Sequence, residues 1–118
     1  MPISNAGMVI AANALRGDIT HLQLHSADPG VNGTSNVTTA ARKPVAWSAA
    51  TADGDFGLSA SIPFNGVASN GAVTWVSGWN QLAAGGTFLG RWQLTGDQTA
   101  NAAGDYTLTS LNIDGSST

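Results

Sequence analysis

The chain has 118 residues, a length that predicts a single domain with one hydrophobic core. Four lysine and arginine residues stand against seven acidic residues, which is too little positive charge for a protein that binds nucleic acid or a membrane surface. No cysteine is present, so disulfide bonds and cysteine-based metal sites are excluded.

Charged residues are unusually scarce. They make up 9% of the chain, against about 25% in ordinary globular domains. A surface with so little charge has weak protection against association. Two interpretations stay open: partners in an assembly cover much of the surface, or the composition reflects a biased genome or a secreted protein. The first four residues lack the features of a secretory signal peptide, so we expect none.

The N-terminal segment, residues 1–17, contains the only predicted helix, over residues 4–16. Ser4 or Asn5 is suited to cap it, and Gly17 is suited to end it. Apolar residues recur in it at helical spacing and so share one face. We expect this segment to dock onto neighbouring subunits through the side chains Ile3, Met8, Ala12 and Leu15.

Residues 21–25 predict a strand, because Leu22 and Leu24 alternate with polar residues. A structural turn is predicted to follow it, formed by Asp28, Pro29 and Gly30. Aspartate can bond its own backbone there, proline fixes φ, and glycine allows a positive φ. The next stretch, residues 31–42, is too polar to form a core element.

The same alternation predicts further strands over residues 45–49, 56–64, 73–79, 88–94 and 105–113. Pro63 cannot donate to a ladder, so its strand ends there or lies at a sheet edge. The apolar parity changes between Leu108 and Leu111, which indicates a bulge or two separate strands.

These elements predict an all-β fold. Six to eight short antiparallel strands, with turn signals between them, form a single β-sandwich or a small jelly-roll-like barrel over residues 18–118. The short helix of residues 1–17 is appended at the N-terminus.

Two motifs resemble chemical sites without qualifying as one. His21 and His25 lie four residues apart, but on a strand that spacing is about 13 Å, too far for one ion to bridge. We therefore expect both histidines to face solvent or an interface. The run of residues 53–57 lacks the ligand spacing of a calcium loop and predicts a turn. We expect no catalytic residue, metal site or cofactor.

The four tryptophans are the strongest binding signal. Trp47, Trp75 and Trp92 share strand faces with apolar residues, which predicts core packing. Trp79 lies among polar neighbours, so we expect it to be the exposed one, in a loop or an assembly interface.

The segment His21-Leu22-x-Leu24-His25-x-Ala27-Asp28-Pro29-Gly30 resembles a family of small virion proteins of tailed bacteriophages. The aromatic stretch of residues 44–47, the glycine turn of residues 85–89 and the turn of residues 101–108 are similar too. The resemblance implies a β-sandwich that is a component of a virion, of the minor tail, tail-fibre or head-decoration type.

We therefore expect a non-enzymatic bacteriophage structural protein, found in the virion and assembled in the host cytoplasm. Its partners would be other virion proteins, on the tail or baseplate or on the capsid surface, and copies of itself in a homo-oligomer. One alternative is a capsid decoration protein that binds as a trimer at threefold axes. The other is a carbohydrate-binding module for host glycans, which predicts at least two exposed, coplanar tryptophans on one face.

Overall fold

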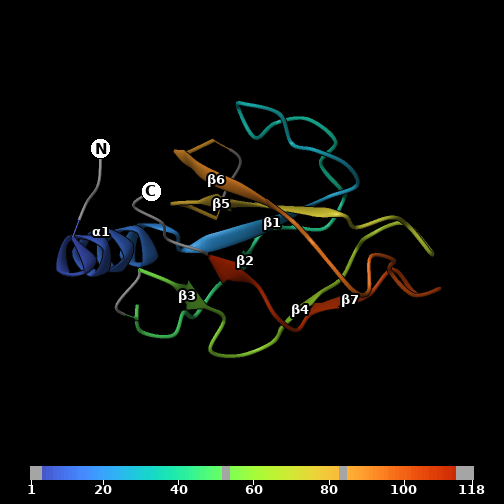
Figure 1. The fold of residues 1–118 in the computed structure, drawn as a ribbon. Helices are drawn as coiled ribbons and strands as arrows, with labels where there is room; N and C mark the ends of the chain where they lie inside the picture. Colours follow the sequence, from blue (N-terminus) through green and yellow to red (C-terminus); the bar gives the residue numbers. More distant parts are fainter. Residues whose placement is uncertain (1–3, 52–53, 83–84, 114–118) are drawn as a thin grey trace.

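The computed structural model describes residues 4–51, 54–82 and 85–113. Within these residues the chain is mostly β, with eight strands in antiparallel sheets and one N-terminal helix, α1 (Asn5–Asp18), at one end of the molecule (Figure 1). The expected all-β fold is thus confirmed. No described helix combines the length and the apolar character needed to cross a membrane.

Helix α1 begins where the sequence predicts and ends slightly later. The Ser4 hydroxyl accepts a hydrogen bond from the Gly7 N–H at 3.1 Å, which caps the N-terminus. Gly17 lies inside the last turn, so the prediction that it ends the helix was wrong. The chain leaves the helix at Ile19, whose N–H still donates to the Leu15 carbonyl at 2.9 Å and whose side chain is buried. Burial of that side chain, rather than glycine conformation, sets the helix end.

The larger sheet has four antiparallel strands in the spatial order β2 (Lys43–Pro44), β1 (His21–His25), β5 (Trp75–Trp79) and β6 (Phe88–Gln93). Its inner face carries Leu22 and Leu24 from β1 and Val76 from β5, none of which is exposed to solvent. The alternation that predicted β1 and β5 therefore selects this face as the one that packs on the core.

Two short ladders lie opposite the inner face (Figure 1). They pair β3 (Phe56–Gly57) with β8 (Asn112–Ile113), and β4 (Ile62–Phe64) with β7 (Tyr106–Leu108). Apolar side chains from both layers form one buried cluster between them. The architecture is a β-sandwich, and the described strands do not close into a barrel.

The strand predicted over residues 56–64 is in fact two strands. Its alternating burial is as expected, with Ile62 and Phe64 buried and Pro63 exposed. The ladder breaks because the partner segment breaks: β4 pairs with β7 and β3 with β8, and the parity change between Leu108 and Leu111 separates those partners. Of the two explanations for that change, separate strands is the right one. Within the described residues Pro63 lies on a strand with one pairing partner, which is one of the two positions predicted for it.

The strand predicted over residues 45–49 does not form. Its backbone hydrogen bonds go to two different places: the Val45 N–H donates to Thr20, whereas the Ala46 carbonyl accepts from Ser59. The segment crosses from the four-stranded sheet toward the β3 side, and only an isolated bridge marks Trp47. Side-chain alternation survives there because Val45 and Trp47 still pack against the core.

Candidate functional site

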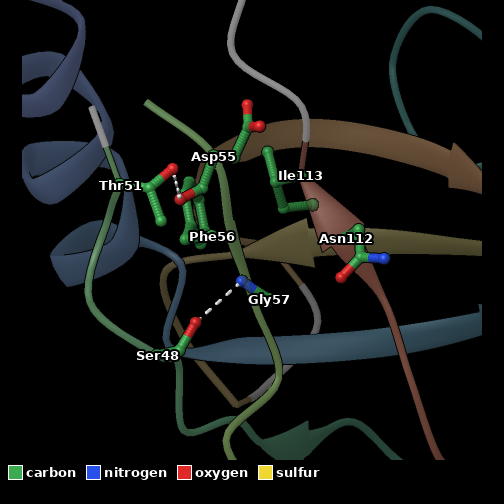
Figure 2. A pocket seen from close by; sticks show the side chains of 7 residues that line it. All are labelled: Ser48, Thr51, Asp55, Phe56, Gly57, Asn112 and Ile113. Carbon is green, nitrogen blue, oxygen red and sulfur yellow. Dashed lines mark hydrogen bonds between the residues drawn. The ribbon is translucent and has the colours of Figure 1, made fainter. Parts of the chain in front are cut away.

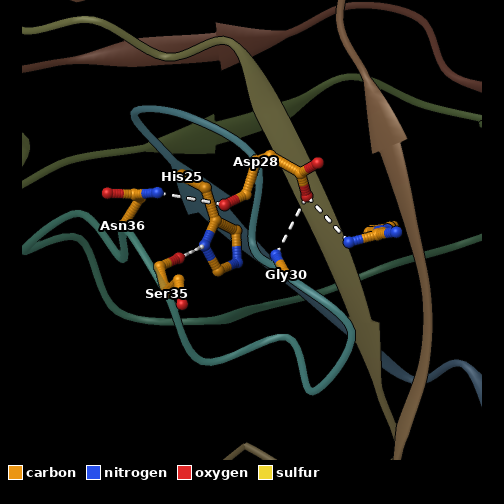
Figure 3. A network of polar contacts seen from close by, with 6 residues as sticks. His25, Asp28, Gly30, Ser35 and Asn36 are labelled. Carbon is orange, nitrogen blue, oxygen red and sulfur yellow. Dashed lines mark hydrogen bonds and ion pairs between the residues drawn. The ribbon is translucent and has the colours of Figure 1, made fainter.

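A long loop, residues 26–42, folds over the outer face of the four-stranded sheet and gives that face its chemistry (Figure 3). It starts with a turn in which an Asp28 carboxylate oxygen accepts from the Gly30 N–H at 2.9 Å, while Gly30 has a φ of 80°. The same oxygen accepts from Arg91 of β6 at 2.9 Å, and the Asn36 amide donates to the Asp28 carbonyl. These contacts tie the start of the loop to β6 and join the Asp28 turn to Asn36 within the loop.

A chain of buried hydrogen bonds lies beneath this loop. His25 Nδ1 lies 2.9 Å from the Ser35 carbonyl, which can only accept, so Nδ1 carries the proton. The Ser77 hydroxyl lies 2.6 Å from His25 Nε2 and accepts from Trp79 Nε1 at 2.7 Å. Neutral His25 thus satisfies every donor and acceptor in the chain of bonds.

The environment of His25 opposes protonation. Burial is the main cause that lowers its pKa below the ordinary 6.5, and the positive charge of Arg42 lowers it further. The hydrogen bond to the Ser35 carbonyl acts in the opposite direction and is the weaker effect. His25 is therefore a structural, uncharged residue at neutral pH.

Arg42 covers the tryptophan of the same network. Its guanidinium carbon lies 4.0 Å from the ring centroid of Trp79, a cation–π contact. It donates to the carbonyls of Gln81 and Gly85 at 3.0 Å each. Arg42 is only 6% exposed, and through these two bonds it holds the segment after β5 against the loop.

A pocket of about 450 Å³ opens beside this cluster. The ring of Phe88 lies 5.5 Å from that of Trp79 and forms part of its wall. Polar groups from the loop and from β1 complete the lining, namely those of Gln23, Asn32, Thr34 and Arg42. The pocket combines aromatic walls with amide, hydroxyl and guanidinium groups, a composition suited to contact with another polar surface.

A second pocket, also of about 450 Å³, lies at the β3–β8 ladder (Figure 2). Its polar groups serve the backbone: the Ser48 hydroxyl accepts from the Gly57 N–H at 3.1 Å, and the Thr51 hydroxyl donates to the Asp55 carbonyl at 3.5 Å. No three acidic, histidine or cysteine side chains gather to bind a metal among the described residues.

The predicted docking face of the helix packs inward in part. Ala12 is 7% exposed and belongs to the core, and Leu15 packs against that core. Met8 is half-buried, next to Gly54. Ile3 lies outside the described residues. The most exposed large apolar side chain of the helix is instead Ile10, at 71%.

The prediction for Trp79 was wrong: it is 4% exposed, under Arg42 and the loop. Trp47 and Trp92 do pack against the core, as expected. Trp75 does not belong to that core and is half-buried, with its side chain on the outer face. Trp79 has polar neighbours in the sequence, which is the pattern of an exposed residue. The pattern misled because the polar partners of Trp79, Ser77 and Arg42, are themselves buried.

The prediction for the two histidines is half right. His21 is partly exposed, and its Nδ1 lies 2.9 Å from the Thr20 hydroxyl. His25 was expected at the surface and is fully buried.

The residues that sequence reasoning missed are Ser77 and Arg42. The pairing of β1 with β5, which sets Gln23 opposite Ser77, brings Ser77 to His25, and the loop places Arg42 over Trp79.

Comparison with known proteins identifies the family. A family model described as podophage GP4 fiber I protein gp80 matches residues 11–116, which is most of the chain. No curated protein and no solved structure matches the chain. The match and the β-rich fold agree with the expected phage protein, although they do not test the segment of residues 21–30 as its signature. The chain belongs to the podophage GP4 fiber I protein gp80 family and is a structural protein of the bacteriophage virion.

Proposed function

We propose that this protein is a non-enzymatic component of a phage tail fibre, which acts by binding other virion proteins and copies of itself. The observation that carries the proposal is the fibre-protein family match over residues 11–116. The structure is consistent with it: in the two pockets described above, Arg42 donates to the Gln81 carbonyl and Ser48 accepts from the Gly57 N–H, so both side chains hold the fold together. The low charge of the chain fits a surface that is covered in an assembly.

The position in the particle is tested on purified virions. Gold-labelled antibody against the chain should decorate the tail, and quantitative mass spectrometry should give its copy number. Label spread over the capsid at threefold positions would instead establish the alternative of a trimeric decoration protein. Absence of the chain from purified particles would contradict both.

We also propose that residues 1–17 contribute a docking contact, through the exposed side of α1 rather than through its buried Ala12. Ile10 is the side chain to test, because it is 71% exposed and its loss should not disturb the core. Ile10→Ser should lower incorporation into particles while the isolated protein stays folded. Val31→Ser, at a site 80% exposed in the loop, is the matched control. Equal incorporation of both variants would remove the docking role.

The alternative of a glycan-binding module has less support. It requires two exposed, coplanar tryptophans, whereas Trp79 is buried under Arg42 and Trp92 packs on the core. The pocket beside Trp79 is the place where a glycan would bind if the alternative held. A glycan array with Trp79→Phe as the control variant decides it.

A further inference from the structure

The four-stranded sheet has two edges of very different character. The β2 edge has two residues, one of them Pro44, so it is a poor template for another strand. The β6 edge has six residues, Phe88–Gln93, without proline or lysine. Within the described residues β6 pairs only with β5. An open edge of this length and composition is the kind to which a further strand adds.

The backbone groups that face outward at this edge follow from the ladder. The Leu94 N–H donates to the Thr74 carbonyl at 2.8 Å, on the β5 side. In an antiparallel strand the N–H and C=O of one residue point to the same side, and successive residues alternate. Trp92 therefore faces β5 as Leu94 does, whereas Arg91 and Gln93 direct their backbone groups away from the sheet.

The edge lacks the charges that usually protect such strands. Its single charged side chain, Arg91, is bound to Asp28 across the outer face at 2.9 Å. Beside the strand runs a groove of about 430 Å³, lined among others by Trp75, Trp92, Gln93, Ser110 and Asn112. Space and backbone groups that have no partner among the described residues thus lie side by side.

We propose that β6 pairs antiparallel with β6 of a second copy of this chain, around a twofold axis at Trp92. This inference rests on the proposed assembly function, since it names the surface and the partner through which that function is carried out. The axis places Arg91 opposite Gln93 of the second copy in a hydrogen-bonded pair, and Trp92 opposite its counterpart. Joining the edges makes one continuous eight-stranded sheet, because each copy contributes four strands.

Side-chain complementarity selects a second copy and this register. A guanidinium has five donors, so Arg91 can keep Asp28 and still donate to the amide oxygen of the opposing Gln93. On the other face the Trp92 ring lies over Gly78 and Gly90 of its own sheet. A twofold axis at Arg91 instead would set two guanidinium groups directly opposite each other, which is unfavourable. One pair of strand edges is a small contact, so we expect it to be weak in isolation and to gain strength by repetition.

Cysteine cross-linking tests the register, and the chain has no cysteine to interfere. Arg91→Cys and Gln93→Cys are made separately, at exposed positions. In a hydrogen-bonded pair the Cα atoms lie about 5.5 Å apart, within the range of a disulfide. Oxidation of the mixed variants at high protein concentration should give a covalent dimer containing one of each, while either variant alone should remain monomeric.

The other outcomes overturn the proposal. Dimers of Arg91→Cys alone, or of Gln93→Cys alone, would show a different axis. No cross-link in the mixture would show that β6 does not pair with itself, leaving the edge to a strand of another virion protein. Thr107→Cys, at an exposed position of β7, mixed with Arg91→Cys, controls for random collision. A negative result together with normal labelling of the tail would refute this pairing and leave the proposed fibre function standing.

Discussion

Both faces of the four-stranded sheet carry buried side chains, which are buried by different means. On the inner face Leu22, Leu24 and Val76 pack against the two short ladders, and burial of apolar surface is sufficient. On the outer face His25, Ser77 and Trp79 are buried under a loop, and each polar atom has a partner. The inner face tolerates changes that keep volume, whereas the outer face depends on hydrogen bonds whose loss leaves buried polar groups unsatisfied.

The largest effect is expected in the core, between the inner face and the two short ladders. Phe64 is 1% exposed in the core, so Phe64→Ala should lower the free energy of unfolding by about 3–5 kcal/mol through lost burial and a cavity. Urea unfolding measures it. The exposed neighbour variant Asn65→Ala is the control and should change stability little. A loss below about 1 kcal/mol would mean that the core between the two layers is not the main source of stability.

A smaller loss is expected from the outer face. Ser77→Ala removes the acceptor of Trp79 Nε1 and the donor to His25 Nε2, leaving two buried groups unsatisfied. We expect the free energy of unfolding to fall by about 2–3 kcal/mol, although only one oxygen atom is lost. Ser110→Ala, at an exposed site, is the matched control for urea unfolding. Equal stability of the two variants would refute the buried network.

The outer face should also respond to pH. The pKa of His25 is lowered in the folded state, so the unfolded chain binds a proton more readily. The stability that neutral His25 contributes is complete above about pH 6.5 and is lost as the pH falls below that value toward the folded pKa.

The corresponding measurement compares urea midpoints at pH 7.5 and 5.5. Wild type should lose stability on acidification, and His25→Gln should lose less. His21→Gln serves as the control because His21 is partly exposed, and it should retain the wild-type slope. Identical slopes in all three proteins would show that His25 does not titrate with folding.

The smallest effect concerns the ion pair that ties the loop to β6. The side chains of Arg91 and Asp28 are 36% and 52% exposed, so Arg91→Gln should cost less than about 1 kcal/mol. Asp28→Ala should cost more, because it also removes the bond to the Gly30 N–H. Thermal unfolding of both variants orders them. The reverse order would indicate that the ion pair, and not the turn, anchors the loop.

Many of the strands could be predicted from the sequence. Alternation located β1, β5, β6 and β7, and parity marked the separation of β7 from β8. The alternation pattern gave a wrong prediction over residues 45–49, because alternation reports which side chains are buried and not which backbone groups pair. There the hydrogen bonds divide between Thr20 and Ser59, which belong to different layers.

The outer face was predicted least well. His25 and Trp79 were placed at the surface because their neighbours in sequence are polar, and residues 31–42 were judged too polar to pack. In the structure Ala40 of that stretch is in the core and Arg42 is 6% exposed. Polar residues can be buried when they satisfy one another, and the sequence does not show which ones meet.

The sequence by itself determined the fold class, the inner core and the resemblance to phage virion proteins, because local alternation and turn chemistry act between near neighbours. The tertiary structure alone decided what lies on the outer face. Strand pairing sets Gln23 opposite Ser77, the loop covers His25, and Arg42 covers Trp79. Each of those contacts joins residues distant in sequence, so their burial depends on the register of the sheet and not on local pattern.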